Sequence, residues 1–183
     1  MTTITEGTPR VWIGCLHHYN AGSLIGDWFD ALGADDVTLA DVHEGSGRSY
    51  ADCEELWCFD HEHLPLEGEL SPAQAADWGR VLAEVDEHLR PALNAWVLSG
   101  DYIAEGTSDL PLVSEFMDRY CGLWESFDEY AQQLADDIGL LDGVPEDVGR
   151  YFDWGSWTRD LGYDYTTVVA SSPECGAYIF RSY

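Results

Sequence analysis

The sequence predicts an α+β fold in three parts, and three observations lead to this class. Runs typical of strands dominate residues 1–69, helical patterns dominate residues 70–110, and residues 111–183 combine helices with two β-rich runs. Separate stretches of strands and helices are typical of α+β proteins. We therefore predict a small α+β N-terminal domain, a helical central domain, and an α+β C-terminal domain that ends in a β-hairpin.

Residues 1–69 contain three apolar runs that are typical of strands. Residues 11–16 form the first and end near the turn-forming residues 20–22, residues 28–29 form a second, paired strand, and residues 56–59 form the third. Residues 35–42 have helical spacing, with acids in the first turn, where the helix dipole favours negative charge. This part is therefore expected to be a small α+β unit.

Residues 70–110 open with the sequence signature of a helix N-terminus. Ser71 is a favourable N-cap, and Pro72 suits the first helical position because proline has no N–H to leave unbonded there. The pattern predicts one helix over 72–89 and a second over 91–98, separated by a proline. The middle of the chain is thus expected to be helical.

Residues 111–183 open with two further helical patterns. Residues 112–120 predict one helix. Ser126 and Glu129 have the spacing of a capping box, which predicts the start of another helix that runs to residue 138.

The end of the chain is expected to add short helices and a hairpin. Residues 145–152 and 154–161 have short helical patterns, and residues 165–169 and 177–180 are rich in β-formers. A turn over residues 171–176 would join the last two runs into a β-hairpin.

The charge of the chain excludes several functions. The 183 residues include 35 Asp and Glu against 8 Arg and no Lys, which gives a net charge of −27, while hydrophobic residues still make up 45%. Such an apolar content is typical of a folded protein. Nucleic-acid binding needs a basic surface, and anionic membranes repel negative charge, so we predict neither partner. No apolar run is long enough to span a membrane.

The acidic residues are spread over the whole chain. Residues 1–69 carry 14 carboxylates and 2 arginines, residues 70–110 carry 7 and 2, and residues 111–183 carry 14 and 4. B-form DNA carries about one negative charge per 1.7 Å of axis, so a net charge of −27 corresponds to roughly 46 Å of duplex, or about 14 base pairs. Because like charges on a compact fold destabilise it, the charge indicates a role at a partner surface that normally binds phosphates.

One group of residues is a candidate metal site. Cys53, Cys58, His61 and His63 lie within eleven residues, and the possible additions are Cys15, His17 and His18. The C-x4-C-x2-H-x-H spacing is not a usual zinc pattern, and Cys53 and Cys58 would face opposite sides of a strand. We therefore predict no metal site and no cofactor, with five reduced cysteines, since an odd number at irregular spacing does not form a disulfide framework.

No motif indicates catalysis. The sequence contains no nucleophile elbow, zinc-protease helix, phosphate-binding loop or EF-hand loop, so we predict that the protein is not an enzyme. The polar residues 1–10 lack a signal-peptide stretch, so we expect a cytoplasmic location. The alternative interpretation is an acidic protein of halophilic type, with a Cys/His zinc site or an unidentified enzymatic activity.

Four segments resemble the ArdA family of antirestriction proteins, which conjugative elements, plasmids and phages encode. Residues 11–28 resemble the family's opening strand, Y-N-x-G turn and G-x-W, and residues 54–60 are similar to its E-E-x(4)-D segment. Residues 144–161 resemble the P-x-x-[LV]-x-x-Y-[IF]-D-[YW]-x(4)-R-D-L stretch around the antirestriction motif, and residues 120–131 also fit. The resemblance covers nearly the whole chain in order.

The resemblance implies an elongated, three-part protein that forms a curved homodimer and displays carboxylates like the phosphates of bent B-DNA. Such a dimer would match about 28 base pairs and occupy the DNA-binding groove of type I restriction–modification enzymes without catalysis. Residues around the antirestriction motif are the implied dimer contacts: Pro145, Tyr151, Phe152, Asp153, Trp154, Arg159, Asp160 and Leu161. The carboxylates expected on the DNA-like surface are Asp27, Asp30, Asp35, Asp36, Glu54, Glu55, Asp60, Glu62, Glu84, Glu87, Asp118, Glu125, Asp128, Glu129, Asp136, Asp137, Asp142, Glu146 and Asp147.

Overall fold

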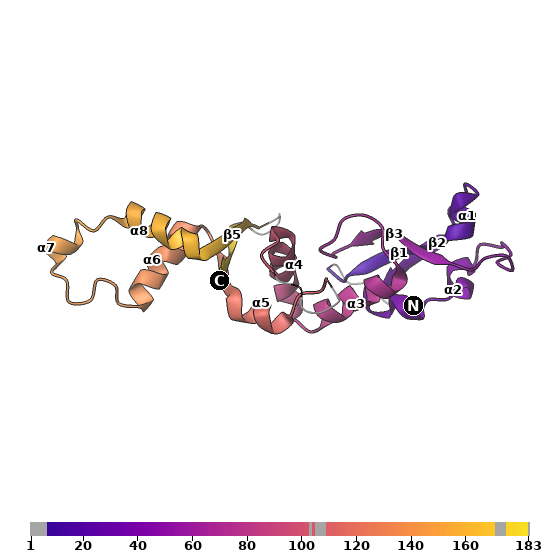
Figure 1. Cartoon of the computed structure of the whole chain (residues 1–183), viewed down its shortest axis with the longest axis horizontal. Helices are drawn as coiled ribbons and strands as arrows, with labels where there is room; N and C mark the ends of the chain where they lie inside the picture. The colour runs from indigo at the N-terminus through magenta and orange to yellow at the C-terminus, as the bar shows by residue number, and fades with distance from the viewer. Residues whose placement is uncertain (1–6, 103, 105–108, 171–174, 183) are drawn as a thin grey trace. The chain divides into compact units, whose positions relative to one another are not determined.

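A computed structural model describes residues 7–102, 104, 109–170 and 175–182 (Figure 1). The chain divides into two compact units, Met1–Asn94 with Ala104–Val113 and Ala95–Ile103 with Ser114–Tyr183. Each unit contains one three-stranded antiparallel sheet together with helices, which confirms the α+β class. The division into three domains stays a prediction.

The first unit is built on a sheet with the order β2-β1-β3. The strands are β1 (Arg10–Cys15), β2 (Gly26–Asp30) and β3 (Leu56–Glu62), so the predicted strands at residues 11–16, 28–29 and 56–59 are confirmed. Strand β1 lies in the centre, and its Val11, Ile13 and Cys15 are completely buried.

Two glycines let an aromatic ring lie across this sheet. Gly14 and Gly26 pair with each other, and the ring of Trp12 covers both. A Cβ at either glycine would stand 2.6 Å from a Trp12 ring carbon. A larger residue at position 14 or 26 would therefore displace the Trp12 ring. This explains why β2 begins with a glycine, Gly26.

The helix predicted over residues 35–42 is wrong in its boundaries. Asp35 and Asp36 end a 3-10 helix, η1 (Ala31–Asp36), and the α-helix α2 (Leu39–His43) begins later. Thr38 is the N-cap of α2: its hydroxyl accepts a hydrogen bond from the Asp41 backbone N–H, and the Asp41 carboxylate accepts one from the Thr38 N–H at 2.8 Å. This capping box fixes the start of α2 at Leu39. A further short helix, α1 (Leu16–Asn20), follows β1.

Helix α3 (Pro72–Ala83) starts as predicted, with Ser71 as N-cap in a capping box with Gln74. It ends six residues before the predicted residue 89, and a 3-10 turn, η2 (Glu87–Leu89), leads into α4 (Arg90–Ser99). The Arg90 side chain donates a hydrogen bond to the Leu82 carbonyl at 2.9 Å. This bond satisfies a carbonyl of the last turn of α3, which would otherwise lack a partner.

The second unit is built on a sheet with the order β4-β6-β5. Strands β5 (Tyr165–Val169) and β6 (Ala177–Arg181) pair antiparallel, which confirms the terminal hairpin; residues 171–174 of the predicted turn lie outside the described residues. Residues 177–180 of the central strand β6 are all buried.

Strand β4 (Tyr120–Trp124) was not predicted from the sequence. The predicted helix over 112–120 is α5 (Val113–Arg119), and β4 follows it without a break. Gly122 has a φ of +109°, a conformation that glycine adopts readily, and it lies at an irregularity in the pairing of β4 with β6. Residues 120–124 thus form a strand because they pair with the distant strand β6, although the spacing of their apolar residues does not indicate a strand.

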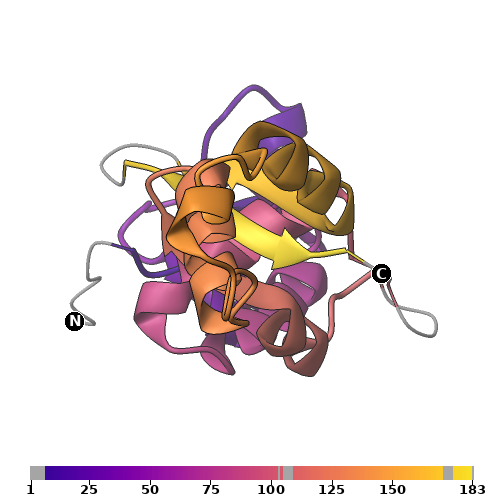
Figure 2. The same cartoon turned by 90° about the vertical axis from the view of Figure 1, so that its left-hand side faces the viewer.

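Helices α6 (Phe127–Asp137) and α8 (Trp154–Leu161) lie near each other in the second unit (Figures 1 and 2). Ser126 caps α6 as predicted, accepting from the Glu129 N–H at 3.2 Å, but the Glu129 carboxylate bonds to the N–H of Glu125 instead of Ser126. The remaining helices are α7 (Glu146–Gly149) and a 3-10 turn, η3 (Gly162–Asp164).

The core of the second unit joins the sheet to α6. Tyr130, Ala177 and Ile179 are buried, and partly buried aromatic residues, among them Trp124 and Tyr165, pack against them. In the described part of the chain, no helix is both long and apolar enough to cross a membrane.

Candidate functional site

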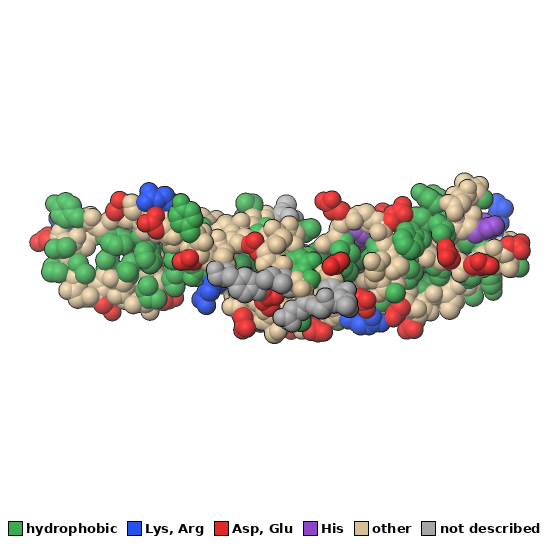
Figure 3. Space-filling model, in the orientation of Figure 1, with side chains coloured by type: hydrophobic (Ala, Val, Ile, Leu, Met, Phe, Trp, Pro, Cys, Tyr) green, Lys and Arg blue, Asp and Glu red, His purple; other side chains and the backbone are tan. Residues whose placement is uncertain are grey.

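The carboxylates predicted for the DNA-like surface all lie in the described part of the chain, and none is buried. Glu62 is half-buried, and the other eighteen are exposed. The acidic side chains on the face drawn in Figure 3 lie over elements of both units. Among the described residues, no Asp or Glu at all is buried. The charge is therefore presented to solvent.

The arginines are largely engaged within the chain. Among the described residues, five of the eight arginines form ion pairs with six carboxylates. The pairs are Arg10–Glu62, Arg80–Asp35, Arg80–Asp77, Arg119–Glu115, Arg150–Asp147 and Arg159–Asp160. Most of these pairs are at least partly exposed and contribute little stability each. In the described part of the chain, most other carboxylates thus stand outside these ion pairs.

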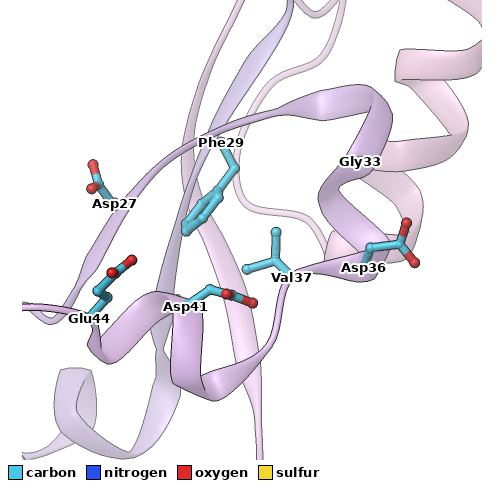
Figure 4. A pocket seen from close by; sticks show the side chains of 7 residues that line it. All are labelled: Asp27, Phe29, Gly33, Asp36, Val37, Asp41 and Glu44. Atoms are coloured by element: carbon cyan, nitrogen blue, oxygen red, sulfur yellow. The ribbon is translucent and has the colours of Figure 1, made fainter. Parts of the chain in front are cut away.

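Four carboxylates surround an open depression in the first unit (Figure 4). Asp27, Asp36, Asp41 and Glu44 line it, and the side chains of Phe29 and Val37 lie between them. The depression has a volume of about 510 Å³. It is formed by β2, η1 and α2.

This acidic depression combines negative charge with a small apolar surface. A lysine or arginine side chain packs its aliphatic stem on apolar groups and holds its charged end in a polar environment. The side-chain and backbone hydrogen bonds from Thr38 lower the pKa of Asp41, which keeps this carboxylate ionised. Sequence reasoning included Asp27 and Asp36 but missed Asp41 and Glu44, because only the fold brings α2 beside β2.

The residues predicted as dimer contacts all lie in the second unit. Tyr151 is 84% exposed and Trp154 is 36% exposed, whereas Phe152 is half-buried, with its ring centroid 4.9 Å from that of Trp154. Single exposed apolar side chains are common on protein surfaces, and Tyr163 and Val169 are exposed to a similar degree. Pro145, Arg159 and Asp160 are also exposed, and Leu161 is half-buried.

Asp153 has a local structural role in this segment. It is the N-cap of α8, and its carboxylate accepts hydrogen bonds from the Ser156 N–H at 3.0 Å and from the Ser156 hydroxyl at 2.8 Å. These bonds lower the pKa of Asp153. The side chain therefore holds the start of α8 in place.

The structure does not bring together the Cys/His residues that the sequence first suggested. Cys58 is buried in β3, where burial raises the pKa of its thiol to about 12, and His61 lies on the same strand, half-buried. His63 is exposed, with a φ of +62°, and His17 is exposed on α1.

A different set of four residues does come together. Cys53 lies beside Cys15 and His18, which were among the possible additions, and beside His43, which sequence reasoning missed. One side-chain N or S atom from each of the four lies within 4.8 Å of the other three. We call this set of four residues the Cys/His cluster.

These features define an α+β protein that presents its carboxylates to solvent and engages most of its arginines within the chain. A family model described as antirestriction protein (ArdA) matches residues 11–173. The chain therefore belongs to the ArdA family of antirestriction proteins, as the resemblance indicated. A search of curated proteins finds no match to the chain.

Proposed function

We propose that this protein inhibits a type I restriction–modification enzyme by competing with DNA for the DNA-binding groove, without catalysing a reaction. The observation that carries this proposal is the exposure of the carboxylates: eighteen of the nineteen predicted surface acids are exposed, and none is buried. Membership of the antirestriction family supports a restriction enzyme as the partner.

The proposed mechanism is electrostatic. A groove that binds DNA offers lysine and arginine side chains to phosphates, and the exposed carboxylates would take the places of these phosphates. The acidic depression supplies one such point of contact, because its carboxylates surround Phe29 and Val37. Complementary charge also accelerates association, so the inhibitor would reach the groove quickly at low salt.

The energy of this interaction would be distributed over many contacts. An exposed ion pair contributes at most about 1 kcal/mol, so a single neutralised carboxylate should weaken inhibition by less than about fivefold. Asp36→Asn, in the acidic depression, is a suitable single variant. Abolition of inhibition by this variant, in a chain that remains folded, would indicate a discrete site instead.

The resemblance further supports a homodimer formed through the segment around the antirestriction motif. Tyr151 and Trp154 are its exposed aromatic residues, and aromatic residues are enriched in protein interfaces. Pairing would place two carboxylate surfaces in one inhibitor and roughly double the length of duplex that it matches.

A cleavage assay with varied DNA concentration tests the competition. If the inhibitor and DNA occupy the same groove, raising the DNA concentration should relieve inhibition until full cleavage returns. Inhibition that stays constant as DNA increases would contradict a shared groove.

The halophilic interpretation of the charge is tested separately. A protein whose acidic surface serves solubility in concentrated salt should unfold when salt is removed, whereas the proposed inhibitor should stay folded. Circular dichroism of the chain at low and at high salt distinguishes these outcomes.

A further inference from the structure

The Cys/His cluster draws its four residues from separate segments of the first unit. Cys15 ends β1, His18 lies in α1, His43 ends α2, and Cys53 precedes β3. The Nδ1 atom of His18 lies 3.3 Å from the Cys15 Sγ, 3.5 Å from the Cys53 Sγ and 3.3 Å from the His43 Nε2. Four donor atoms thus face one point.

These distances match the edges of a tetrahedral zinc site. Zn–S bonds of about 2.3 Å and Zn–N bonds of about 2.0–2.1 Å place a sulfur and a nitrogen ligand about 3.5 Å apart, and two nitrogens about 3.3 Å apart. The observed N–S distances are 3.3 and 3.5 Å, and the N–N distance is 3.3 Å. The other three pairs of donor atoms lie within 4.8 Å of each other, so side-chain movements alone could close the four atoms around an ion.

His43 is already oriented for such a role. Its Nδ1 lies 2.8 Å from the Leu39 carbonyl oxygen, which can only accept a hydrogen bond, so Nδ1 must carry the hydrogen. The lone pair of the neutral ring is then on Nε2, the atom that faces the other three side chains. Metal-binding histidines commonly donate their second N–H to a carbonyl in this way.

Burial favours a closed site over an open one. Cys15, His43 and Cys53 are buried, and His18 is half-buried. Four protein ligands of this kind leave no position for water or substrate, which is typical of structural zinc sites. Two thiolates and two imidazoles in a tetrahedron are also the ligand set that zinc prefers.

We propose that Cys15, His18, His43 and Cys53 bind one Zn²⁺ ion in a closed tetrahedral site that stabilises the first unit. The two thiols would release their protons on binding, and the two thiolates would balance the charge of the ion. The site would join β1, α1 and α2 to residues 44–55, a segment without helix or strand. It departs from the expectation of no metal, which rested on the spacing of Cys53, Cys58, His61 and His63.

The site would also have a consequence for the acidic surface. Glu54 and Glu55 directly follow Cys53 and are exposed. Holding Cys53 on the ion would restrict the backbone that carries these two carboxylates. The metal proposal does not depend on the antirestriction proposal, because it rests on the donor atoms alone.

Elemental analysis of the full chain, purified under reducing conditions with zinc present and then gel-filtered, tests the proposal. We expect one zinc per chain. The variant Cys53→Ser should lose it, whereas His17→Gln and Cys175→Ser, which change exposed residues of the same types outside the cluster, should keep it. An unmodified chain without zinc, or a Cys53→Ser variant with undiminished zinc, would overturn the site.

Cobalt substitution provides a test that needs no variant. Co²⁺ added to the metal-free, folded chain should give the absorption bands of tetrahedral cobalt together with thiolate-to-metal charge transfer. Cobalt bound without charge transfer would exclude cysteine ligands. Removal of zinc by a chelator should also lower the melting temperature, and an unchanged melting temperature would contradict a stabilising role.

Discussion

Gly79 shows how one residue decides the packing of α3 against η1. A Cβ at this position would lie 2.6 Å from the Leu32 Cα and 2.7 Å from the Ala31 carbonyl carbon. Both atoms belong to the backbone, so they cannot move aside as a flexible side chain would. The two elements can approach this closely only because residue 79 has no side chain.

We predict that Gly79→Ala destabilises the chain by about 1–3 kcal/mol, the usual cost of overpacking. Gly149→Ala is the matched control: Gly149 is also helical, but nothing lies within 4 Å of a Cβ built there. Alanine favours helix over glycine, so the control should be neutral or slightly stabilising. Denaturant unfolding of both variants measures the difference, and equal stabilities would contradict the close approach.

Asp153 gives a second prediction at the scale of one residue. Its hydrogen bonds from Ser156 lower its pKa below the usual 3.8, so its contribution to stability is present above that pH and is lost as the pH falls through the lowered value. Asp153→Ala should therefore melt at a lower temperature than the unmodified chain at neutral pH. The difference should shrink in strong acid; a difference independent of pH would show that the carboxylate does not act as the cap.

At the scale of the element, residues 144–161 combine a short helix, a capped helix and the exposed rings of Tyr151 and Trp154. We predict that Tyr151→Ala dissociates the proposed dimer, because Tyr151 is 84% exposed in the single chain and belongs to that segment. Tyr163→Ala is the control, since Tyr163 is 80% exposed but lies beyond the resembling residues 144–161.

Light scattering at micromolar concentration measures both variants. The expected result is a monomer mass for Tyr151→Ala and a dimer mass for Tyr163→Ala and for the unmodified chain. A monomer mass for the unmodified chain would exclude the dimer at these concentrations.

Elements with a local signal were predictable from sequence, and elements fixed by distant contacts were not. Ser71 and Pro72 mark the start of α3 by their own chemistry, and the structure confirms it. Strand β4 has no such mark, because its pairing with β6 involves residues more than fifty positions away. The end of α3 likewise carries no local mark, and its last turn is bonded by a side chain from the next helix, that of Arg90.

The two candidate sites also differ in how far the sequence could predict them. The exposure of the predicted carboxylates followed from composition, because the cost of burying an unpaired charge keeps acids at the surface. The sequence named Cys15, His18 and Cys53 among the candidate ligands but not His43, which is 25 residues from His18 and lies in a helix that was predicted with other boundaries. The fold selects Cys53 from the first group of candidates and Cys15 and His18 from the possible additions, and it adds His43.

At the scale of the whole molecule, the dominant property is a net charge of −27 without a single lysine. Interactions of exposed charges are screened by salt, so binding through carboxylates should weaken steeply as salt rises. Binding through apolar contacts would change much less. The salt dependence therefore distinguishes a DNA-like surface from an ordinary protein interface.

The most direct test is a titration of the chain against a labelled DNA duplex bound to the methyltransferase core of a type I enzyme, at two salt concentrations. We predict displacement of the duplex at a near-stoichiometric amount of protein at low salt, and weaker displacement at high salt. A duplex that stays bound at both salt concentrations would contradict the central claim that the protein takes the place of DNA.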